Sequence, residues 1–536
     1  MSDALTTNGP DATALEQAVQ QLVTDKVASG IHDQNPTLWG PDAESEASIR
    51  LSWVDLAESS RPLVAEISAL RAELAAEGVD HVVLAGMGGS SLAPEVITGT
   101  AGVPLVALDT TDAGQVSAAL TDQLDRTVIV VSSKSGGTVE TDSHRRVYEK
   151  AFTDAGIDAK SRIVVVTDPG SPLEKLGHDA GYRKVFLADP HVGGRYSALT
   201  AFGLVPSGLA GADIGALLDD AAAVSGQLGS DEPTNPGLRL GALLGLAHNA
   251  GSEKVVLADT GSGIAGFGDW VEQLIAESTG KQGKGLLPVV VESVDSPGFA
   301  DAGKDAILVS LGPDAATTAP SGYTAGIRYP LGAAFLIWEY AIAVAGRLIG
   351  INPFDQPNVE EAKAQARSLL DASAAAEAPK PAFVEGAIEV YADEQTLHGA
   401  TTLAAVLSGL RTLAPGNGYL SLQAYLDRHA DDSAADLRPE VARSTGLQTT
   451  FGWGPRFLHS TGQYHKGGHP NGGFIQITGA VRQDLEIPDR PYSFAVLQAA
   501  QAAGDAAVLA AKGRPVLRLH LTDRAAGLGQ LMEAIS

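Results

Sequence analysis

Short runs rich in Val, Ile and Leu alternate with longer, helix-like stretches along most of this chain. One series begins at residue 81 with HVVLAG and continues through VPLVALD, TVIVVSS, RIVVVTD and KVFLAD. A second series begins at residue 254 with KVVLAD and continues through LLPVVVES, AILVSL, AIEVYA and FIQITGA. Strands that alternate with helices in this way pair in parallel sheets that the helices cover. The pattern therefore predicts an α/β fold with two such units.

The chain has 536 residues, which is too long for a single hydrophobic core. Apolar residues at helical spacing in ALEQAVQQLV and LVAEISALRAELAAEG predict a helical arm at the start. Pro, Gly and small polar residues cluster at 225–237 and 371–382, where we expect joints. The run GYLSLQAYL could be strand or helix. We predict two three-layer αβα subdomains with parallel sheets, preceded by the arm and followed by a tail. The tail reads as helix, strand and helix. The expected ranges are 1–75 (arm), 76–230 (first subdomain), 235–490 (second subdomain) and 491–536 (tail).

The chain is strongly acidic, since 64 Asp and Glu outnumber 37 Lys and Arg and give a net charge of −27. Nucleic acid and anionic membranes both attract basic surfaces, so we expect neither as a partner. A small anionic substrate remains open, because a few local cations and backbone amides can bind it. The absence of cysteine excludes disulfides, thiolate catalysis and cysteine-bound metals.

The sequence does not predict a membrane segment. Its N-terminal MSDALTTNGPDATALEQ lacks the basic start and apolar core of a secretory signal. The most apolar long window, from Leu331 to Gly350, carries Glu339 and Arg347, which a bilayer would tolerate only at a cost. We therefore interpret this window as a buried helix and expect a soluble, cytoplasmic protein.

Two loops rich in Gly and Ser each follow a predicted strand and open a predicted helix. The first, GMGGSS at 86–91, has glycines that would let backbone N–H groups approach an anion at a helix N-terminus. Taken alone it is weak evidence, because such turns serve tight packing about as often as binding. The second, SSKSGGTVET at 132–141, adds hydroxyl groups and a lysine, which suit a phosphate monoester.

A Ser-rich helix cap is the alternative for the second loop. We favour phosphate binding, because both loops would meet at the carboxyl ends of adjacent strands, where open α/β sheets bind ligands. The loops lack the spacing of a Walker loop or of a dinucleotide fingerprint. The expected substrate contacts are Gly89, Ser90, Ser133, Lys134, Ser135 and Thr138.

A strand followed by GxGGSS and another followed by SSxSGGTxET resemble the sugar isomerase (SIS) domain, which binds phosphosugars in isomerases and in regulators. Further segments resemble glucose-6-phosphate isomerase and occur in the order of that family: GGRYSALTAFGLVP (193–206), WVEQLIAESTGKQGKGLLPV (270–289), INPFDQPNVEEAK (351–363) and RFLHSTGQYHKGG (456–468). The overall divergence resembles the type found with transaldolase in some bacteria. The resemblance implies SIS-like subdomains and reversible interconversion of glucose 6-phosphate and fructose 6-phosphate in glycolysis and gluconeogenesis.

The expected reaction moves a proton between two neighbouring carbons through a cis-enediol, so one base must reach both carbons. Glu277 lies in an apolar run, where burial would raise the pKa of its carboxyl toward neutrality. A glutamate on a helix surface is the ordinary alternative, and the resemblance favours the base. Arg195 follows two glycines in a turn and could stabilise the enediolate oxygen, although a surface arginine would look the same. The reaction is internal to the substrate and needs no metal or organic cofactor.

The substrate is mainly a closed ring, which an acid–base group must open. The resemblance assigns this role to His465, with His459, Gln463 and His469 as neighbours. Three histidines in a Gly-rich loop without nearby carboxylates are poor evidence for a metal site. The resemblance also implies that Glu140 and Gln501 bind the sugar, although Glu140 could instead be a first-turn carboxylate that answers the helix dipole.

The C-terminal helix departs from the family. The family has a lysine seven residues after the glutamine, where this chain has Val508. Lys512 and Arg514 lie just beyond, and we assign the role to neither.

Two alternatives remain for the function. A dual phosphoglucose and phosphomannose isomerase would need more room at C2 of the sugar. A non-catalytic SIS regulator would usually carry a DNA-binding helix-turn-helix, for which this acidic chain has no basic surface. The expected partner is therefore a small phosphosugar. Common members of the family are homodimers whose histidine arrives from the partner subunit, and a homodimer is expected here by that resemblance.

Overall fold

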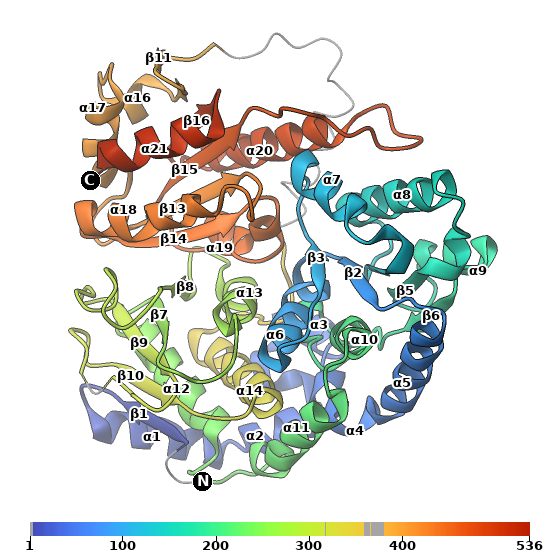
Figure 1. Ribbon diagram of the computed structural model, residues 1–536. Coiled ribbons are helices and arrows are strands. Elements are labelled where there is room, and N and C mark those ends of the chain that lie inside the picture. The colour runs from blue at the N-terminus through green and yellow to red at the C-terminus, as the bar shows by residue number, and fades with distance from the viewer. Residues whose placement is uncertain (1–3, 317, 359–364, 366–379, 536) are drawn as a thin grey trace.

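The computed structural model describes residues 4–316, 318–358, 365 and 380–535. Its strands form three sheets, two with five strands and one with six (Figure 1). The first sheet has the order β3-β2-β4-β5-β6, the second β1-β10-β9-β7-β8, and the third β11-β12-β16-β15-β13-β14. The predicted α/β class with helix-covered sheets is confirmed.

The first sheet is parallel throughout and is covered on both faces. In β2, Val82 and Leu84 pack into the core that contains α5, α6 and α10, whereas Val83 and Ala85 pack against α8 and α9 on the other face. Strands buried on both faces read as continuous apolar runs, as TVIVVS does in β4. The elements are β2 (His81–Ala85), β3 (Val106–Leu108), β4 (Thr127–Ser132), β5 (Ile163–Thr167), β6 (Lys184–Leu187), α5 (Arg61–Ala76), α6 (Leu92–Ala101), α7 (Ala113–Thr121), α8 (Val139–Asp154), α9 (Pro172–Ala180) and α10 (Ala201–Ala210).

The second sheet is parallel except for β1, which pairs antiparallel with β10. One of its faces packs on α12 and α14, and the other contacts α13 and aromatic residues of the third sheet. Helix α14 is long and apolar enough to cross a membrane, but 89% of its most apolar window is buried in the protein, as predicted for a core helix. The elements are β1 (Leu5–Asn8), β7 (Lys254–Asp259), β8 (Leu287–Val290), β9 (Ala306–Leu311), β10 (Thr324–Ile327), α11 (Ile214–Leu228), α12 (Pro236–Asn249), α13 (Phe267–Thr279) and α14 (Leu331–Ile349).

The third sheet was not separated from the second by the sequence analysis. The strands expected in one subdomain at 235–490 are divided between both sheets, and the tail adds β16 to the third. The run GYLSLQAYL is strand β13, and the tail is helix, strand and helix as predicted. The elements are β11 (Phe383–Glu385), β12 (Ile388–Tyr391), β13 (Tyr419–Tyr425), β14 (Gln448–Trp453), β15 (Gly472–Gly479), β16 (Val516–Leu521), α16 (Glu394–Leu397), α17 (Leu403–Ser408), α18 (Leu437–Thr445), α19 (Gly462–Gly467), α20 (Phe494–Ala511) and α21 (Arg524–Ile535).

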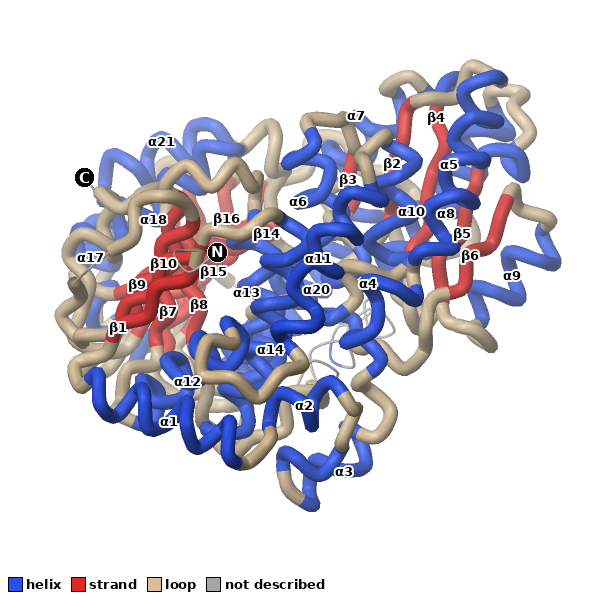
Figure 2. Tube along the Cα trace, turned by 90° about the horizontal axis from the view of Figure 1, so that it is seen from below, coloured by secondary structure: helices blue, strands red, loops and turns tan. Residues whose placement is uncertain are grey.

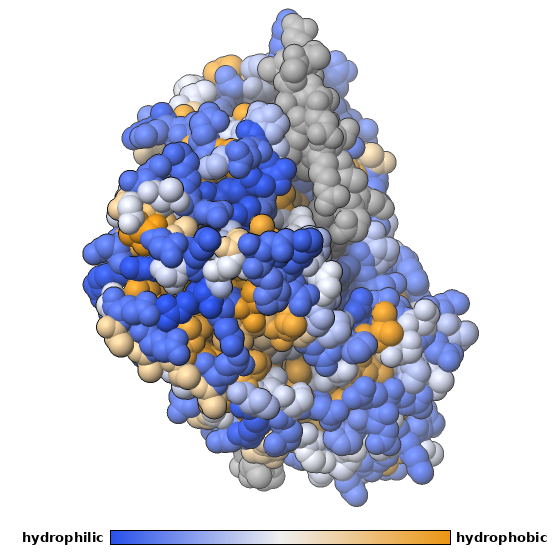
Figure 3. All heavy atoms as spheres, turned by 90° about the vertical axis from the view of Figure 1, so that its right-hand side faces the viewer, coloured by the Kyte–Doolittle hydropathy of each residue, from blue (hydrophilic) through white to orange (hydrophobic). Residues whose placement is uncertain are grey.

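The N-terminal arm is helical as predicted, apart from β1, and it lies along the second sheet and α10 (Figure 2). The joint predicted at 225–237 connects α11 to α12, and most of the joint predicted at 371–382 lies outside the described residues. The predicted subdomain ranges remain predictions. On the face shown in Figure 3, hydrophilic residues cover most of the surface and hydrophobic residues lie in small groups. The other helices of the arm are α1 (Ala12–Thr24), α2 (Val27–His32), α3 (Pro41–Ala47) and α4 (Leu56–Ser59).

Candidate active site

The first glycine-rich loop brings parts of all three sheets together. A Cβ atom on Gly88 would stand 2.7 Å from both Gln273 Nε2 and the carbonyl oxygen of His459. A Cβ on Gly89 would stand 2.0 Å from the carbonyl oxygen of Gly194, which no structure tolerates without a shift. Gly88 also has a φ of +55°, a region that favours glycine. The glycines therefore allow this loop to touch α13, the 193–196 turn and the segment around His459.

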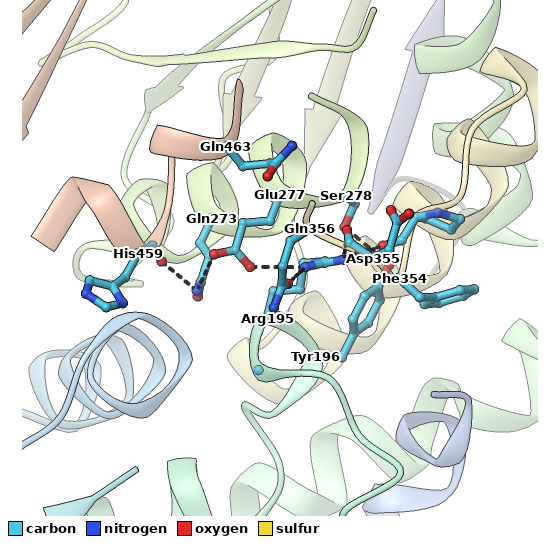
Figure 4. A network of polar contacts seen from close by, with 12 residues as sticks. Arg195, Tyr196, Gln273, Glu277, Ser278, Phe354, Asp355, Gln356, His459 and Gln463 are labelled. Carbon is cyan, nitrogen blue, oxygen red and sulfur yellow. Dashed lines mark hydrogen bonds and ion pairs between the residues drawn. The ribbon is translucent and has the colours of Figure 1, made fainter. Parts of the chain in front are cut away.

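Glu277 and Arg195 form a buried pair beside this loop (Figure 4). Arg195 Nη1 lies 3.1 Å from Glu277 Oε2, and the two side chains are 2% and 8% exposed. Gln273 Nε2 donates to Glu277 Oε1 at 3.3 Å and to the carbonyl oxygen of His459 at 2.8 Å. One amide thus connects the predicted base to the chain that precedes α19.

The Arg195 guanidinium is held in place by the segment 353–356. Its Nη2 donates to the carbonyl oxygens of Pro353, at 2.8 Å, and Asp355, at 3.0 Å. Its Nη1 also donates to Gln356 Oε1. A cation fixed in this way needs little reorganisation when negative charge develops next to it.

Lys281 supports the same segment and was not among the predicted site residues. Its Nζ donates to the carbonyl oxygen of Asn352 at 2.7 Å and to Asp355 Oδ1 at 2.6 Å. Burial, together with the nearby charge of Arg195, lowers the pKa of Lys281 to about 8. The lysine of the ESTGK segment was the available signal for this residue.

A second polar cluster joins Glu140, Gln501 and His459. Glu140 Oε1 accepts a hydrogen bond from Gln501 Nε2 at 2.7 Å and lies 3.0 Å from His459 Nε2. Thr111 Oγ1 donates to Gln501 Oε1 at 2.8 Å and orients the amide. Glu140 and Gln501, which we expected to bind the sugar, therefore meet, and the histidine that meets them is His459.

The structure does not bring His465 to this cluster. Its imidazole is 2% exposed and lies between the rings of Tyr419, Phe457 and Phe474, against the third sheet. Its polar neighbours are Ser421 Oγ at 3.5 Å and Gln423 Nε2 at 3.4 Å. Burial holds the pKa of His465 well below its usual value, so the ring is neutral. Because α19 turns His465 toward the sheet, it is His459 that lies beside Glu140.

The second loop forms a ring of hydroxyls and amides at the start of α8. Ser133 Oγ lies 2.9 Å from Thr138 Oγ1 and accepts from Gly136 N at 3.1 Å, and Ser135 Oγ accepts from Gly137 N at 3.2 Å. Thr138 is the N-cap of α8 but makes no side-chain capping bond within the described residues. The helix N-terminus is thus not closed by its own cap residue, unlike the Ser-rich cap that was the alternative.

Lys134 and Ser90 differ from the other expected substrate contacts. Lys134 Nζ lies 2.5 Å from Asp168 Oδ2 and 3.3 Å from the carbonyl oxygen of Pro190, so its charge is already engaged outside the loop. Ser90 is buried in the short helical turn η3 (Gly88–Ser90). Its neighbour Ser91 donates to Asp109 Oδ2 at 3.0 Å.

A lysine contacts the C-terminal helix from an unexpected position. Lys466 Nζ, on α19, lies 2.5 Å from Asp505 Oδ1, and both side chains are buried. Asp505 is one helical turn after Gln501, which binds Glu140. Of the two cations considered from sequence, Lys512 is exposed at the end of α20, and Arg514 donates to the carbonyl oxygen of Gly468.

Among the described residues, no three His, Asp or Glu side chains form a group that could hold a metal ion. What the site does hold is a carboxylate beside a fixed guanidinium, a histidine beside a second carboxylate, and an open helix N-terminus. Such an arrangement can move protons at one end of a small molecule and bind an anion at the other.

The chain is similar in sequence and fold to known glucose-6-phosphate isomerases. A family model described as phosphoglucose isomerase matches residues 63–286. A protein named glucose-6-phosphate isomerase from Streptococcus pyogenes serotype M4 is 29% identical over 319 residues, which cover 49% of this chain and 68% of that protein. Another, from serotype M49, is 30% identical over 297 residues, which cover 45% of this chain and 65% of that protein.

An archaeal relative and a crystal structure match over a longer range. A "probable glucose-6-phosphate isomerase" from Natronomonas pharaonis is 28% identical over 406 residues, which cover 67% of this chain and 92% of that protein. The crystal structure of a glucose-6-phosphate isomerase from Chlamydia trachomatis aligns with a TM-score of 0.56 at 18% identity. That alignment covers 69% of this chain and 89% of the other, and it supports the fold.

Proposed function

We propose that the chain belongs to the phosphoglucose isomerase family, whose model matches residues 63–286, and that it interconverts glucose 6-phosphate and fructose 6-phosphate. The observation that carries this proposal is the buried pair of Glu277 and Arg195 beside an open phosphate-type loop. The streptococcal relatives are matched over about two thirds of their length. The proposed activity of the whole chain is therefore argued from the residues of its own site.

The proton transfer is assigned to Glu277. In the direction toward fructose 6-phosphate, its carboxylate takes the proton from C2 of the open-chain aldose and an enediolate forms. The hydroxyl proton passes from O2 to O1, and the same carboxyl group returns its proton to C1, so the carboxylate is regenerated and no redox partner is needed. Arg195, held by Pro353 and Asp355, lies next to this carboxylate and stabilises the negative oxygen of the intermediate.

Ring opening is assigned to His459 and its partner Glu140. The imidazole moves a proton between the C1 hydroxyl and the ring oxygen, and the Glu140 carboxylate, 3.0 Å away, stabilises the charged ring. Gln501 holds that carboxylate in place through its amide. The two assigned acid–base groups are connected through Gln273, which binds both Glu277 and the backbone of His459.

The phosphate is assigned to Ser133, Ser135, Thr138 and the first amides of α8. A helix N-terminus carries partial positive charge and unpaired N–H groups, so it binds an anion although the protein as a whole is acidic. Lys134 is left out of this set because Asp168 already engages its charge. The assignment implies a small phosphosugar as partner and a place in glycolysis and gluconeogenesis, in the cytoplasm.

The test is conversion of fructose 6-phosphate to glucose 6-phosphate by the purified protein, coupled to a dehydrogenase. Glu277→Gln should lower kcat by about 100- to 10,000-fold, because the amide cannot accept the proton. Glu272→Gln is the matched control on the same helix: burial, with the nearby Asp269 charge, raises the pKa of Glu272 far above its usual value, so an uncharged amide changes little there.

Two outcomes would contradict these assignments, and a third would extend them. Equal activity in wild type and Glu277→Gln would leave the reaction but reject the base. An inactive wild type that still binds the phosphosugar would favour another substrate or a sensor. Comparable turnover of mannose 6-phosphate, measured in parallel, would extend the activity to a dual isomerase.

A further inference from the structure

Two arginines and three carboxylates meet where the three sheets join. Arg456 contacts Glu95 Oε2 at 2.5 Å, Asp109 Oδ2 at 3.1 Å and Asp269 Oδ2 at 3.0 Å. Arg428 contacts Glu95 Oε1 at 2.5 Å and lies 3.8 Å from Asp109 Oδ1. We call these five residues the arginine junction. Glu95 and Asp109 come from the first sheet's unit, Asp269 from α13, and the arginines from the third sheet's unit.

Arg456 itself and two of its three carboxylate partners lie on segments of the active site. Arg456 opens the short helix η9 (Arg456–His459), whose last residue faces Glu140. Asp269 lies in the first turn of α13, the helix that carries Gln273 and Glu277. Asp109 accepts the hydroxyl of Ser91, the last residue of the first glycine-rich loop. One guanidinium therefore ties together the segments that carry the two assigned acid–base groups.

The junction is charged and closely compensated. Burial opposes ionisation of Glu95, but the charges of Arg456 and Arg428 outweigh it and lower the pKa of Glu95 to about 2. Arg456 is 7% exposed, so its charge is also largely removed from water. Asp109 is 1% exposed, whereas the side chains of Glu95 and Asp269 are 27% and 54% exposed. Removing the guanidinium of Arg456 would therefore leave the buried Asp109 with less compensation and would release the contact to Asp269.

We propose that Arg456 is a positioning residue for the isomerase reaction: it holds His459 against Glu140 and holds both in register with Glu277. This role rests on the proposed function of His459 and Glu277. Arg456 touches neither of them directly, so it acts through the position of η9 and of α13. Lysine cannot replace it fully, because an ammonium lacks the planar fork that reaches three carboxylates at once.

A cavity next to the junction makes the proposal testable by chemical rescue. This cavity of about 440 Å³ is lined by Glu95, Asp269, Arg428 and Arg456, with apolar side chains of α6 and of the segment 103–105 beside them. If Arg456 is shortened to alanine, free guanidinium can enter from the cavity and pair with the carboxylates that remain.

The experiment compares Arg456→Ala with Arg438→Ala. Arg438 is an equally buried arginine that also joins the third sheet's unit to the second, through Glu292 at 2.6 Å and the carbonyl oxygen of Pro297 at 3.2 Å. Both variants should lose thermal stability. Only Arg456→Ala should lose kcat, by about 10- to 100-fold, because small displacements of catalytic groups cost this much. Its KM should change little, since the phosphate loop is untouched.

Millimolar guanidinium chloride, compared with the same concentration of sodium chloride, should restore part of kcat in Arg456→Ala and leave Arg438→Ala unchanged.

The second measurement does not depend on activity. In the NMR spectrum of protein labelled with ¹³C at histidine Cε1, the signal of His459 is identified as the one that is missing from the spectrum of His459→Gln. That signal should move in Arg456→Ala and stay in place in Arg438→Ala. If Arg456→Ala does not fold, Arg456→Lys should show the same shift with a smaller loss of kcat.

Equal loss of kcat in both alanine variants would overturn the proposal, as would an unmoved His459 signal or the absence of guanidinium rescue. A wild type without isomerase activity would reject the proposed function instead. In that case the His459 signal still decides whether Arg456 positions the histidine.

Discussion

Two histidines six residues apart, His459 and His465, have opposite surroundings. His459 is partly exposed, and its Nε2 faces the carboxylate of Glu140. His465 is buried among aromatic rings, where its pKa is too low for it to carry a proton near neutral pH. Residue type and spacing alone make the two equivalent, and the difference arises because His459 ends η9, whereas His465 lies on α19, which turns it toward the sheet.

Exchange of these histidines for glutamine should separate catalysis from packing. His459→Gln should lose about 100- to 10,000-fold in kcat on the cyclic substrate, with little change in melting temperature, because only the proton-transfer group is removed. His465→Gln should melt at a lower temperature and keep most of its kcat, because it disturbs an aromatic core. Steady-state kinetics and thermal melts of both variants check this. The reverse pattern would return ring opening to His465.

Lys281 should cause kcat to fall at basic pH. Its pKa is lowered to about 8, so above this pH it loses the charge that holds Asp355 and, through it, Arg195. We expect kcat to fall above about pH 8, and Lys281→Arg, which stays charged, to move that fall to higher pH. The measurement is kcat as a function of pH for both proteins. A basic limb that is the same in Lys281→Arg would show that another group titrates.

At the scale of elements, the first glycine-rich loop is a packing device as well as part of the site. A side chain at Gly89 would collide with the carbonyl oxygen of Gly194, whereas a side chain at Gly194 would not collide with the loop. Around Gly194, an added Cβ would have no neighbour within 4 Å among the described residues. Contact between this loop and the 193–196 turn places Arg195 in front of Glu277.

Gly89→Ala and Gly194→Ala therefore form a matched pair. Gly89→Ala should cost about 1–3 kcal/mol of stability and most of the activity, because the loop and the turn must separate. Gly194→Ala should stay close to wild type in both. Denaturant melts and kcat/KM values measure the two effects. Full activity in Gly89→Ala would mean that the loop can shift without moving Arg195.

At the scale of the whole molecule, one chain supplies every residue assigned to the proposed chemistry. Glu140 comes from the first sheet's unit, Glu277 from the second and His459 from the third, and all are connected within one chain. The homodimer expected from the family resemblance remains a prediction. The histidine–carboxylate contact, however, does not need a partner subunit.

Complementation between two inactive variants tests this arrangement. A mixture of Glu277→Gln and His459→Gln, refolded together, should stay inactive, because each site takes both residues from the same chain. Light scattering on the same mixture reports whether dimers form. Recovery of about a quarter of wild-type activity, as random pairing of exchanged subunits would give, would show that the histidine crosses between subunits.

Local patterns were enough for much of this protein. Apolar runs predicted the strands from β2 to β9 and the buried helix α14, because the identity of an element depends on short-range sequence and on burial of its own side chains. Family motifs led to Glu277, Arg195, Glu140 and Gln501, which the structure brings together in two linked clusters.

Tertiary structure alone decided the rest. The split between second and third sheets, the contact of His459 rather than His465 with Glu140, the contact of Lys134 with Asp168, and the arginine junction all depend on segments far apart in the chain. Strands of two different sheets show the same alternation with helices, so the sequence does not tell which sheet a strand joins. A charged residue in a loop has no local preference for its ion-pair partner. Such pairings follow from how completed elements pack, which no window of the sequence contains.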